Sequence, residues 1–254
     1  MKRWLAEMQR KGAAPGTVRN AYRVLVPVFA KALEDECVRA DPTAPIRRSD
    51  LPRSRRMEML FLDAEEVLRL AEAAGEHGVV IDFAARTGMR AGEIGALRMK
   101  NVDLLRGEVR VVASASEANG VRHETATKTG EERTVRLPSS LVRRLREYVA
   151  AQPAKKPSSY FFTDHRGGDG PLNHGAWYRQ VFRPAVRRAG LDPALRFHDL
   201  RHTCASLLAA ANVPPKAVQK HLGHSSVAVT LDRYTHLYKN TEDDVRDALE
   251  RAFA

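Results

Sequence analysis

The chain has 254 residues, of which 43% are hydrophobic and 29% are charged, with 13 Pro and 16 Gly. This length and composition exclude a disulfide-stapled miniprotein, a collagen and a wholly disordered chain, and they allow one large domain or two smaller ones. Lys and Arg number 42 against 31 Asp and Glu, which gives a formal net charge of +11. A surplus of this size attracts polyanions, so nucleic acid is the leading class of partner, although many basic proteins bind none.

Neither a membrane segment nor a disulfide framework is predicted. The apolar runs are far shorter than the roughly 20 residues of a bilayer span, and the first residues, MKRWLAEMQRKG, contain no apolar signal core. We therefore expect a cytoplasmic protein with no membrane partner. The two cysteines, Cys37 and Cys204, lie far apart without a CxxC spacing, so we expect no structural zinc site and interpret both as buried thiols.

Residues 1–48 have the pattern of a small helical module. A short helical segment around Trp4 to Met8 precedes a longer one that opens at Thr17 and ends before Asp41 and Pro42. The apolar residues of the longer segment fall on one helical face: Val18, Tyr22, Leu25, Phe29 and Leu33. We expect a partial domain whose core is small for independent stability.

Residues 49–57 are predicted to form a basic linker between two domains. The segment RRSDLPRSRR, residues 47–56, has one acidic residue, Asp50, against five arginines, and Pro52 disfavours a helix there. The five are Arg47, Arg48, Arg53, Arg55 and Arg56. Because phosphate backbones bind clustered cations, we interpret these arginines as DNA-binding residues.

Residues 58–254 predict a larger, mainly helical domain. Asp63 and Glu66 have the form of a capping box at the start of a helix that carries Val67, Leu68 and Leu70. Further helices are expected over residues 79–87, 91–97, 139–151, 173–189, 198–211, 214–221 and 226–237. A final amphipathic helix, residues 241–253, has an apolar face that requires a groove to pack in.

A small β-region interrupts the helices. Residues 108–112 alternate between apolar and polar side chains, a polar stretch follows, and residues 132–137 alternate again. Lys128, Thr129 and Gly130 form a turn-rich join, so Lys128 is expected on a hairpin. The predicted fold class is therefore mainly α with a small antiparallel β-sheet (α+β).

Four separated segments carry polar residues suited to chemistry on a phosphodiester: TGMRAGEIGALR with Arg90, ATKTGEERTVRLP with Lys128, HDLRHT with His198 and Arg201, and LGHSSVAVTLDRYTH with His224 and Tyr234. In this order they resemble the catalytic signature of the tyrosine recombinases, the phage integrase family of site-specific DNA recombinases. The resemblance covers about residues 58–240. Residues 1–48 more weakly resemble the later helices of the family's helical, SAM-like core-binding domain.

Arginine suits the needs of phosphoryl transfer. Displacement at phosphorus adds negative charge to the nonbridging oxygens, and a guanidinium donates two hydrogen bonds to phosphate while staying protonated. Arg90 and Arg201 are therefore a candidate clamp on the phosphate, with Glu93 in a supporting role one turn after Arg90. The simpler interpretation is that all three are ordinary surface residues.

Histidine, lysine and tyrosine are the other residue types that cleavage of a phosphodiester would use here. His198 precedes Arg201 by three residues, so the two share a helix face; a neutral histidine can accept a proton and a protonated one can donate, and the sequence leaves this open. Lys128 can protonate the departing 5′ oxygen as general acid. The resemblance implies that His224 donates a hydrogen bond to the scissile phosphate. It also implies that Tyr234 is the nucleophile, which forms a 3′-phosphotyrosine and conserves bond energy without ATP.

The resemblance also implies partners. Double-stranded DNA is the expected substrate, the protein is expected at the nucleoid, and a homo-tetramer is expected to exchange strands on DNA. The helix over residues 241–253 would dock on an adjacent protomer, or equally fold back onto its own domain. We expect no metal and no cofactor, because arginine, lysine and histidine supply the charge.

Three other functions remain open on the sequence. A type IB topoisomerase uses similar residues but reseals the original strand. A truncated or inactive accessory protein would bind DNA without cutting it. A metal hydrolase could use a set of histidines, although few carboxylates and no HExxH motif accompany them: these are His198, His202, His221, His224 and His236.

Overall fold

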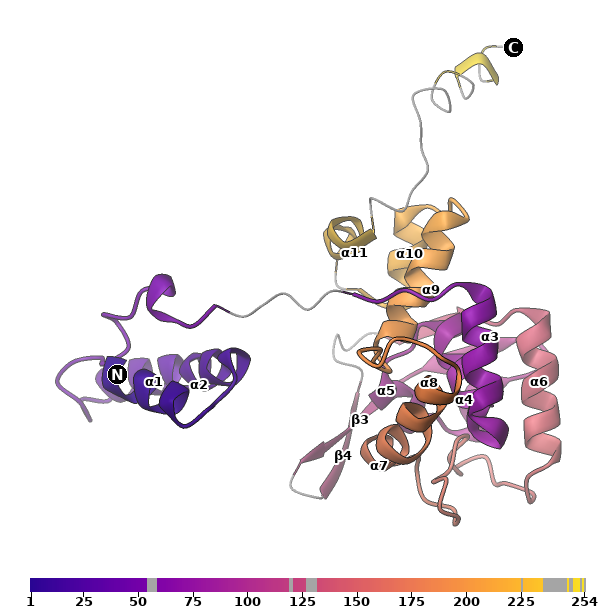
Figure 1. Ribbon diagram of the computed structural model, residues 1–254, viewed down its shortest axis with the longest axis horizontal. Helices are drawn as coiled ribbons and strands as arrows, with labels where there is room; N and C mark the ends of the chain where they lie inside the picture. Colours follow the sequence, from indigo (N-terminus) through magenta and orange to yellow (C-terminus); the bar gives the residue numbers. More distant parts are fainter. Residues whose placement is uncertain are drawn as a thin grey trace. The chain divides into compact units, whose positions relative to one another are not determined.

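The protein is described by a computed structural model over residues 1–53, 59–118, 121–126, 132–224 and 226–234, together with residues 246, 249–251 and 253. The chain divides into two compact units, Met1–Glu58 and Met59–Ala254 (Figure 1). Arg55, Arg56, the hairpin lysine Lys128 and most of the expected helix over residues 241–253 lie outside the described residues. Among the described helices, none is long and apolar enough to cross a membrane.

The first unit contains two helices, α1 (Lys2–Arg10) and α2 (Pro15–Glu34). α2 begins two residues earlier than predicted, because a proline at the first helical position is already set to the helical φ angle. Among the described residues of this unit, the buried apolar side chains are Leu5 of α1 and Val18 of α2. The Tyr22 hydroxyl of α2 donates to the Thr43 carbonyl at 3.2 Å. Cys37, expected to be a buried thiol, is exposed, because it follows the end of α2 instead of facing a core.

The second unit is mainly helical with small antiparallel sheets, so the predicted fold class is confirmed. Its helices are α3 (Ala64–Ala73), α4 (Gly78–Thr87), α5 (Ala91–Gly95), α6 (Ser139–Ala150), α7 (His174–Trp177), a π-helical turn (Tyr178–Phe182), α8 (Arg183–Arg188), α9 (Asp199–Ala210), α10 (Pro215–Leu222) and α11 (Val227–Tyr234). The expected capping box of α3 is present: the Glu66 amide donates to Asp63 Oδ1 at 2.7 Å, and the Asp63 amide donates to Glu66 Oε2 at 3.0 Å.

Two groups of strands lie between α5 and α6. β1 (Val102–Asp103), β2 (Glu108–Val111) and β5 (Arg133–Arg136) form an antiparallel sheet, with Val109 opposite Val135. β3 (Ala113–Ala118) and β4 (Val121–Ala126) form a separate two-stranded pair that the sequence did not predict. Its residues, ASASEA and VRHETA, are largely small, polar and exposed, so they lack the apolar alternation that indicates a strand.

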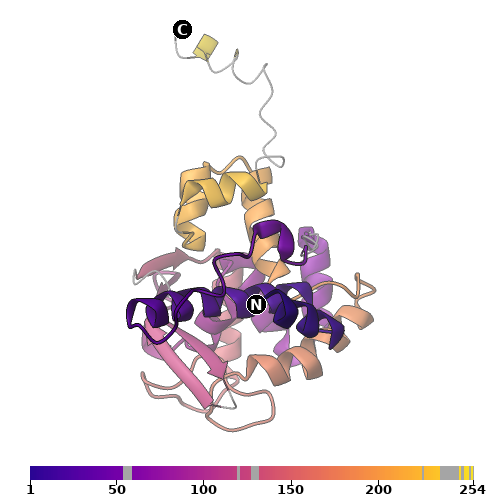
Figure 2. The ribbon, with the colours of Figure 1, turned by 90° about the vertical axis from the view of Figure 1, so that its left-hand side faces the viewer.

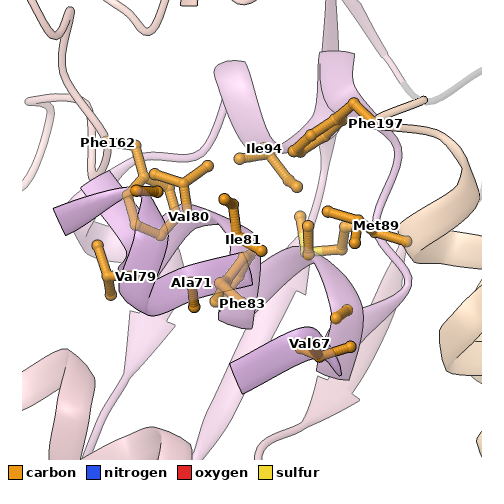
Figure 3. Packing of buried hydrophobic residues seen from close by; sticks show 14 of the residues in the cluster. Val67, Ala71, Val79, Val80, Ile81, Phe83, Met89, Ile94, Phe162 and Phe197 are labelled. Atoms are coloured by element: carbon orange, nitrogen blue, oxygen red, sulfur yellow. The ribbon is translucent and has the colours of Figure 1, made fainter. Parts of the chain in front are cut away.

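The main core of the second unit lies around α3 and α4. Every side chain of α4 except Arg86 is buried, and Figure 3 shows apolar side chains of both helices gathered with Ile94, Phe162 and Phe197. α4 therefore forms a rigid element that ends at Gly88, two residues before Arg90.

A smaller apolar cluster holds α9, α10 and α11 together (Figures 1 and 2). It is built from Cys204, Ala205, Ala209, Val218, Leu222 and Tyr234. α4 packs against α9, which connects this cluster to the main core. The three segments that carry Arg90, Arg201 and Tyr234 therefore meet at one end of the second unit.

The close approach of α4, α9 and α10 depends on Gly88, which has a left-handed φ of 60°. A Cβ atom there would lie 2.4 Å from Leu222 Cδ2 and 3.2 Å from Cys204 Sγ, both of which are buried. We expect Gly88→Ala to lower the free energy of unfolding by about 3 kcal/mol, since backbone strain and overpacking add. Gly190→Ala is the matched control: its φ is 65° and nothing lies near its Cβ, so about 1 kcal/mol is expected. Equal losses in urea unfolding would contradict the packing argument.

Candidate active site

Arg90 is held in place by Glu93 and by the end of α10. It is the residue that caps α5: its amide donates to Glu93 Oε2 at 2.8 Å, and its Nη1 donates to Glu93 Oε1 at 2.8 Å. Its Nη2 donates to the Gly223 carbonyl at 2.9 Å. Because Gly223 ends α10 in a left-handed conformation and precedes His224, this bond links Arg90 to the backbone beside His224.

A second arginine shares the same carboxylate. Arg133 of β5 donates from Nη1 to Glu93 Oε1 at 3.0 Å and from Nη2 to Glu93 Oε2 at 2.7 Å. Its Nε donates to the His221 carbonyl at 3.2 Å, and the side chain is only 10% exposed. Strand alternation explains its position, because Arg133 lies on the same face of β5 as buried Val135.

Glu93 is a buried carboxylate between two guanidiniums. Burial by itself raises the pKa of Glu93, but the hydrogen bonds and positive charges of Arg133 and Arg90 outweigh it, so the pKa lies below the ordinary glutamate value. The carboxylate is therefore ionised at neutral pH. It fixes the geometry of both arginines while leaving the group as a whole positive.

Arg201 is the most deeply buried cation of the site. It lies on α9 with 3% exposure, and its Nη1 donates to the Gly88 carbonyl at 2.6 Å. Burial, followed by the positive charge of Arg90, lowers the pKa of Arg201 to about 10, so it stays protonated at neutral pH. Within the part of the chain that the structure describes, its Nη2 atom has no hydrogen-bond partner. A buried, charged N–H group without an acceptor is a favourable contact for an anion.

The N-terminal turn of α9 carries two histidines. Arg196 and Asp199 fix this turn: the Arg196 amide and Nε donate to Asp199 Oδ2 at 2.8 and 2.9 Å. His198 precedes the helix and is exposed, whereas His202, one turn later, is buried. The two imidazole rings are 5.0 Å apart between centroids and nearly perpendicular.

Tyr234 is a buried tyrosine at the last residue of α11. Its hydroxyl lies 2.6 Å from Nδ1 of His202, and its ring makes an edge contact with Phe61, with centroids 6.4 Å apart. It also contributes to the electrostatic field at Arg201. With 1% exposure, the Tyr234 side chain is shielded from solvent.

The structure brings six of the predicted residues together. Arg90, Glu93 and Arg201 form the charged centre, His198 and Tyr234 adjoin it through α9 and α11, and His224 follows the carbonyl that Arg90 binds. Lys128 lies outside the described residues, as do Arg55 and Arg56. The remaining linker arginines, Arg47, Arg48 and Arg53, belong to the first unit.

Two residues at the centre were not predicted to act there. Arg133 was only part of the context of the hairpin lysine, and its position on the buried face of an alternating strand would have revealed it. His202 was considered only as a metal ligand, and its helical spacing of four from His198 would have placed both on one face. Among the described residues, no group of three or more His, Cys, Asp or Glu side chains is arranged to hold a metal ion.

We expect the loss of the Glu93 carboxylate to destabilise the folded protein. Glu93→Ala leaves the largely buried Arg133 unpaired, so we expect the free energy of unfolding to fall by about 3–5 kcal/mol. Because the folded-state pKa of Glu93 is depressed, this contribution is present above the ordinary glutamate pKa and is lost as the pH falls below it. Urea unfolding at pH 7 and at acidic pH measures both effects.

The matched control is Glu108→Ala. Glu108 also pairs with an arginine, Arg136, at 3.1 Å, but the Arg136 side chain is 80% exposed. Screening by water limits such a pair to less than about 1 kcal/mol. Similar losses for the two variants, or a Glu93→Ala difference that does not shrink in acid, would contradict the buried-network interpretation.

Solved structures define the class of this fold. The chain resembles the Tn1549 transposon integrase that was solved in complex with a circular intermediate DNA, with a TM-score of 0.78 and 24% identity. The match covers 98% of this chain and 83% of that one. The crystal structure of XerA recombinase matches with a TM-score of 0.57 and 21% identity, covering 98% of this chain and 96% of that one. The fold is that of integrases and recombinases.

The family model for the phage integrase family matches residues 60–241, and the chain belongs to this family. A XerC-like tyrosine recombinase of Caldanaerobacter subterraneus is 25% identical over all of this chain and 70% of its own length. The ICEBs1 integrase of Bacillus subtilis is 26% identical over 96% of this chain and 67% of its own length, and XerA of Saccharolobus solfataricus is 29% identical over 98% and 72%. The resemblance to tyrosine recombinases, and with it the predicted class of DNA strand-breaking and rejoining enzyme, is confirmed.

Proposed function

We propose that this chain is a site-specific DNA recombinase in which Tyr234 attacks one strand, forms a 3′-phosphotyrosine and releases a 5′ hydroxyl. The observation that carries the proposal is that the buried Tyr234 hydroxyl lies 2.6 Å from Nδ1 of His202, the residue next to Arg201, whose Nη2 has no hydrogen-bond partner among the described residues. Family membership supports the same reaction.

The arginines stabilise the transition state in this mechanism. Arg201 and Arg90 donate hydrogen bonds to the nonbridging oxygens, where negative charge grows as the phenol attacks. Glu93, which Arg133 also binds, keeps Arg90 oriented. Fixed donors of this kind lower the barrier because no reorganisation is needed at the moment of reaction.

Lys128 and the two predicted histidines handle protons and hydrogen bonds. We assign to Lys128 the protonation of the departing 5′ oxygen, which is otherwise a poor leaving group. His224 and the exposed His198 hydrogen-bond the phosphate oxygens. The phosphotyrosyl bond keeps the energy of the broken phosphodiester, so the 5′ hydroxyl of another strand can reverse the attack and complete an exchange.

Double-stranded DNA is the proposed substrate, and the solved Tn1549 transposon integrase was captured with DNA. The first unit and the linker arginines are proposed to bind the duplex together with the second unit. A homo-tetramer is the proposed assembly, because exchange between two duplexes requires four cleavages. The helix predicted over residues 241–253 is a proposed contact between protomers.

Covalent trapping tests the proposed function. The full chain is incubated with nicked duplexes of random sequence, once with EDTA and once without it, and the products are separated on a denaturing gel. We expect a covalent protein–DNA adduct that peptide mass spectrometry assigns to Tyr234, and sequencing of the trapped DNA would give the target site. Retained DNA without an adduct would indicate a binding protein only, and cleavage that EDTA abolishes would indicate a metal hydrolase.

Salt dependence tests the linker. Each arginine that neutralises a phosphate releases counterions, so the logarithm of the association constant should fall by about 0.9 for each tenfold rise in salt per contact. We expect the slope to become shallower when the linker arginines are changed to glutamine: Arg47, Arg48, Arg53, Arg55 and Arg56. An unchanged slope, measured by fluorescence anisotropy with the trapped duplex, would remove the linker from the DNA interface.

A further inference from the structure

His202 contacts the Tyr234 hydroxyl, and none of the roles proposed above for binding the phosphate requires this contact. Nδ1 of His202 lies 2.6 Å from the Tyr234 hydroxyl, which is the atom that must lose a proton when it attacks phosphorus. An imidazole protonated at Nε2 has a lone pair at Nδ1, so the tyrosine hydroxyl can donate to it. A general base has to lie within this distance of the proton that it removes.

The surroundings of His202 keep this contact fixed. His202 is buried in α9, one residue after Arg201, and its ring lies against the ring of His198. Tyr234 belongs to the apolar cluster that joins α9 to α11, and its ring packs edge-on against Phe61. Both partners are thus held by packing, so the hydrogen bond is preorganised and does not depend on a mobile side chain.

We infer that His202 is a further catalytic residue of the proposed reaction: its Nδ1 accepts the hydroxyl proton of Tyr234 as the phenol oxygen attacks phosphorus. The new bond joins the tyrosine oxygen to phosphorus, and the bond from phosphorus to the 5′ oxygen breaks. The tyrosine proton moves to His202, and the 5′ oxygen receives a proton from the general acid assigned above, Lys128. In the rejoining step a 5′ hydroxyl gives its proton to the neutral Lys128 amine as its oxygen attacks phosphorus. The bond from phosphorus to the tyrosine oxygen breaks, and His202 returns its proton to the departing phenol.

This assignment resolves a choice that the sequence left open. His198 was a candidate proton acceptor because it shares a motif with Arg201, but it is exposed at the start of α9. Nδ1 of His202 lies within hydrogen-bond distance of the hydroxyl of the nucleophile, and its side chain is buried. The two histidines therefore have different tasks: His198 contacts phosphate oxygens, and His202 takes the proton.

The test rests on the proposed function and uses the full chain with the duplex recovered by trapping, nicked so that cleavage is irreversible. In His202→Asn the amide side chain retains a hydrogen-bonding group near the position of Nδ1 but cannot take up a proton. We expect the single-turnover rate of adduct formation to fall by about 10²–10⁴-fold. DNA affinity and the melting temperature are measured in parallel, and His202→Gln provides a second variant with the same limitation.

A more acidic nucleophile separates proton transfer from positioning. A ring-fluorinated tyrosine at position 234 loses its proton more readily, so it should recover at least about tenfold of the rate in His202→Asn while changing the otherwise unaltered protein little. His198→Asn is the matched control, and fluorination should not restore its activity. A His202→Asn rate within twofold of the original, or recovery confined to His198→Asn, would overturn the inference. Absence of any Tyr234 adduct in the unaltered protein would instead overturn the proposed function itself.

Discussion

Tyr234→Phe is expected to form no covalent adduct with DNA, a loss of about 10⁴-fold or more, since no other group replaces a missing nucleophile. The variant retains the aromatic ring that packs against Phe61 in the α9–α11 cluster, so the fold and DNA binding should persist. Loss of the hydroxyl leaves Nδ1 of the buried His202 without this hydrogen bond, which should cost about 1 kcal/mol of unfolding free energy.

Tyr148→Phe is the matched control for this prediction. Tyr148 is a partly buried tyrosine whose hydroxyl donates to the Phe161 carbonyl at 3.5 Å, and it packs against the main core, outside the candidate site. It should form the adduct at the rate of the unaltered protein. An adduct that survives in Tyr234→Phe, on a denaturing gel with the trapped duplex, would show that another residue is the nucleophile.

Arg201→Lys is expected to lower the rate of strand cleavage by about 10³-fold, the scale of effect of an arginine that stabilises a transferring phosphoryl group. The guanidinium binds the Gly88 carbonyl through Nη1 while Nη2 remains available to a phosphate oxygen. A lysine has a single nitrogen on a flexible chain and cannot reproduce this planar, two-sided geometry. Affinity for DNA should change far less, because the positive charge remains.

Arg188→Lys is the control for the arginine prediction. Arg188 of α8 also binds a carbonyl, that of Ala73, through Nε at 2.9 Å and Nη2 at 2.6 Å, but it is exposed and outside the candidate site. Its cleavage rate should equal that of the unaltered protein. If Arg201→Lys cleaves as fast as Arg188→Lys in single-turnover assays, Arg201 does not stabilise the transition state.

Local sequence patterns predicted most of the helices because their signals are short-range. The Asp63 capping box and the break at Gly88 each depend on neighbours within one turn, and both occur at the predicted residues. The β3–β4 hairpin was missed for a physical reason. Its stability comes from contacts distant in the sequence, such as Arg122 Nη2 donating to the Gly95 carbonyl at 2.7 Å and Tyr160 bonding to Glu124.

In the candidate site, too, local motifs revealed some residues and only the structure revealed others. The motifs identified Arg90, His198, Arg201, His224 and Tyr234 because each lies in a recognisable local context. Neither the bond from Arg133 to Glu93 nor the pairing of His202 with Tyr234 has a local signal, since the partners lie 40 and 32 residues apart in the sequence. Such contacts exist only after β5, α5, α9 and α11 have packed together.

The sequence by itself predicted the mainly helical fold from its periodicity, and the family and six of the residues proposed to act on DNA from the resemblance of its motifs and their order. Only the tertiary structure decided that Nη2 of Arg201 has no acceptor among the described residues and that His202 contacts the Tyr234 hydroxyl. Burial and hydrogen-bond partners are properties of packed elements, so the task of Arg201 and the contact of His202 depend on how α4, α9 and α11 meet.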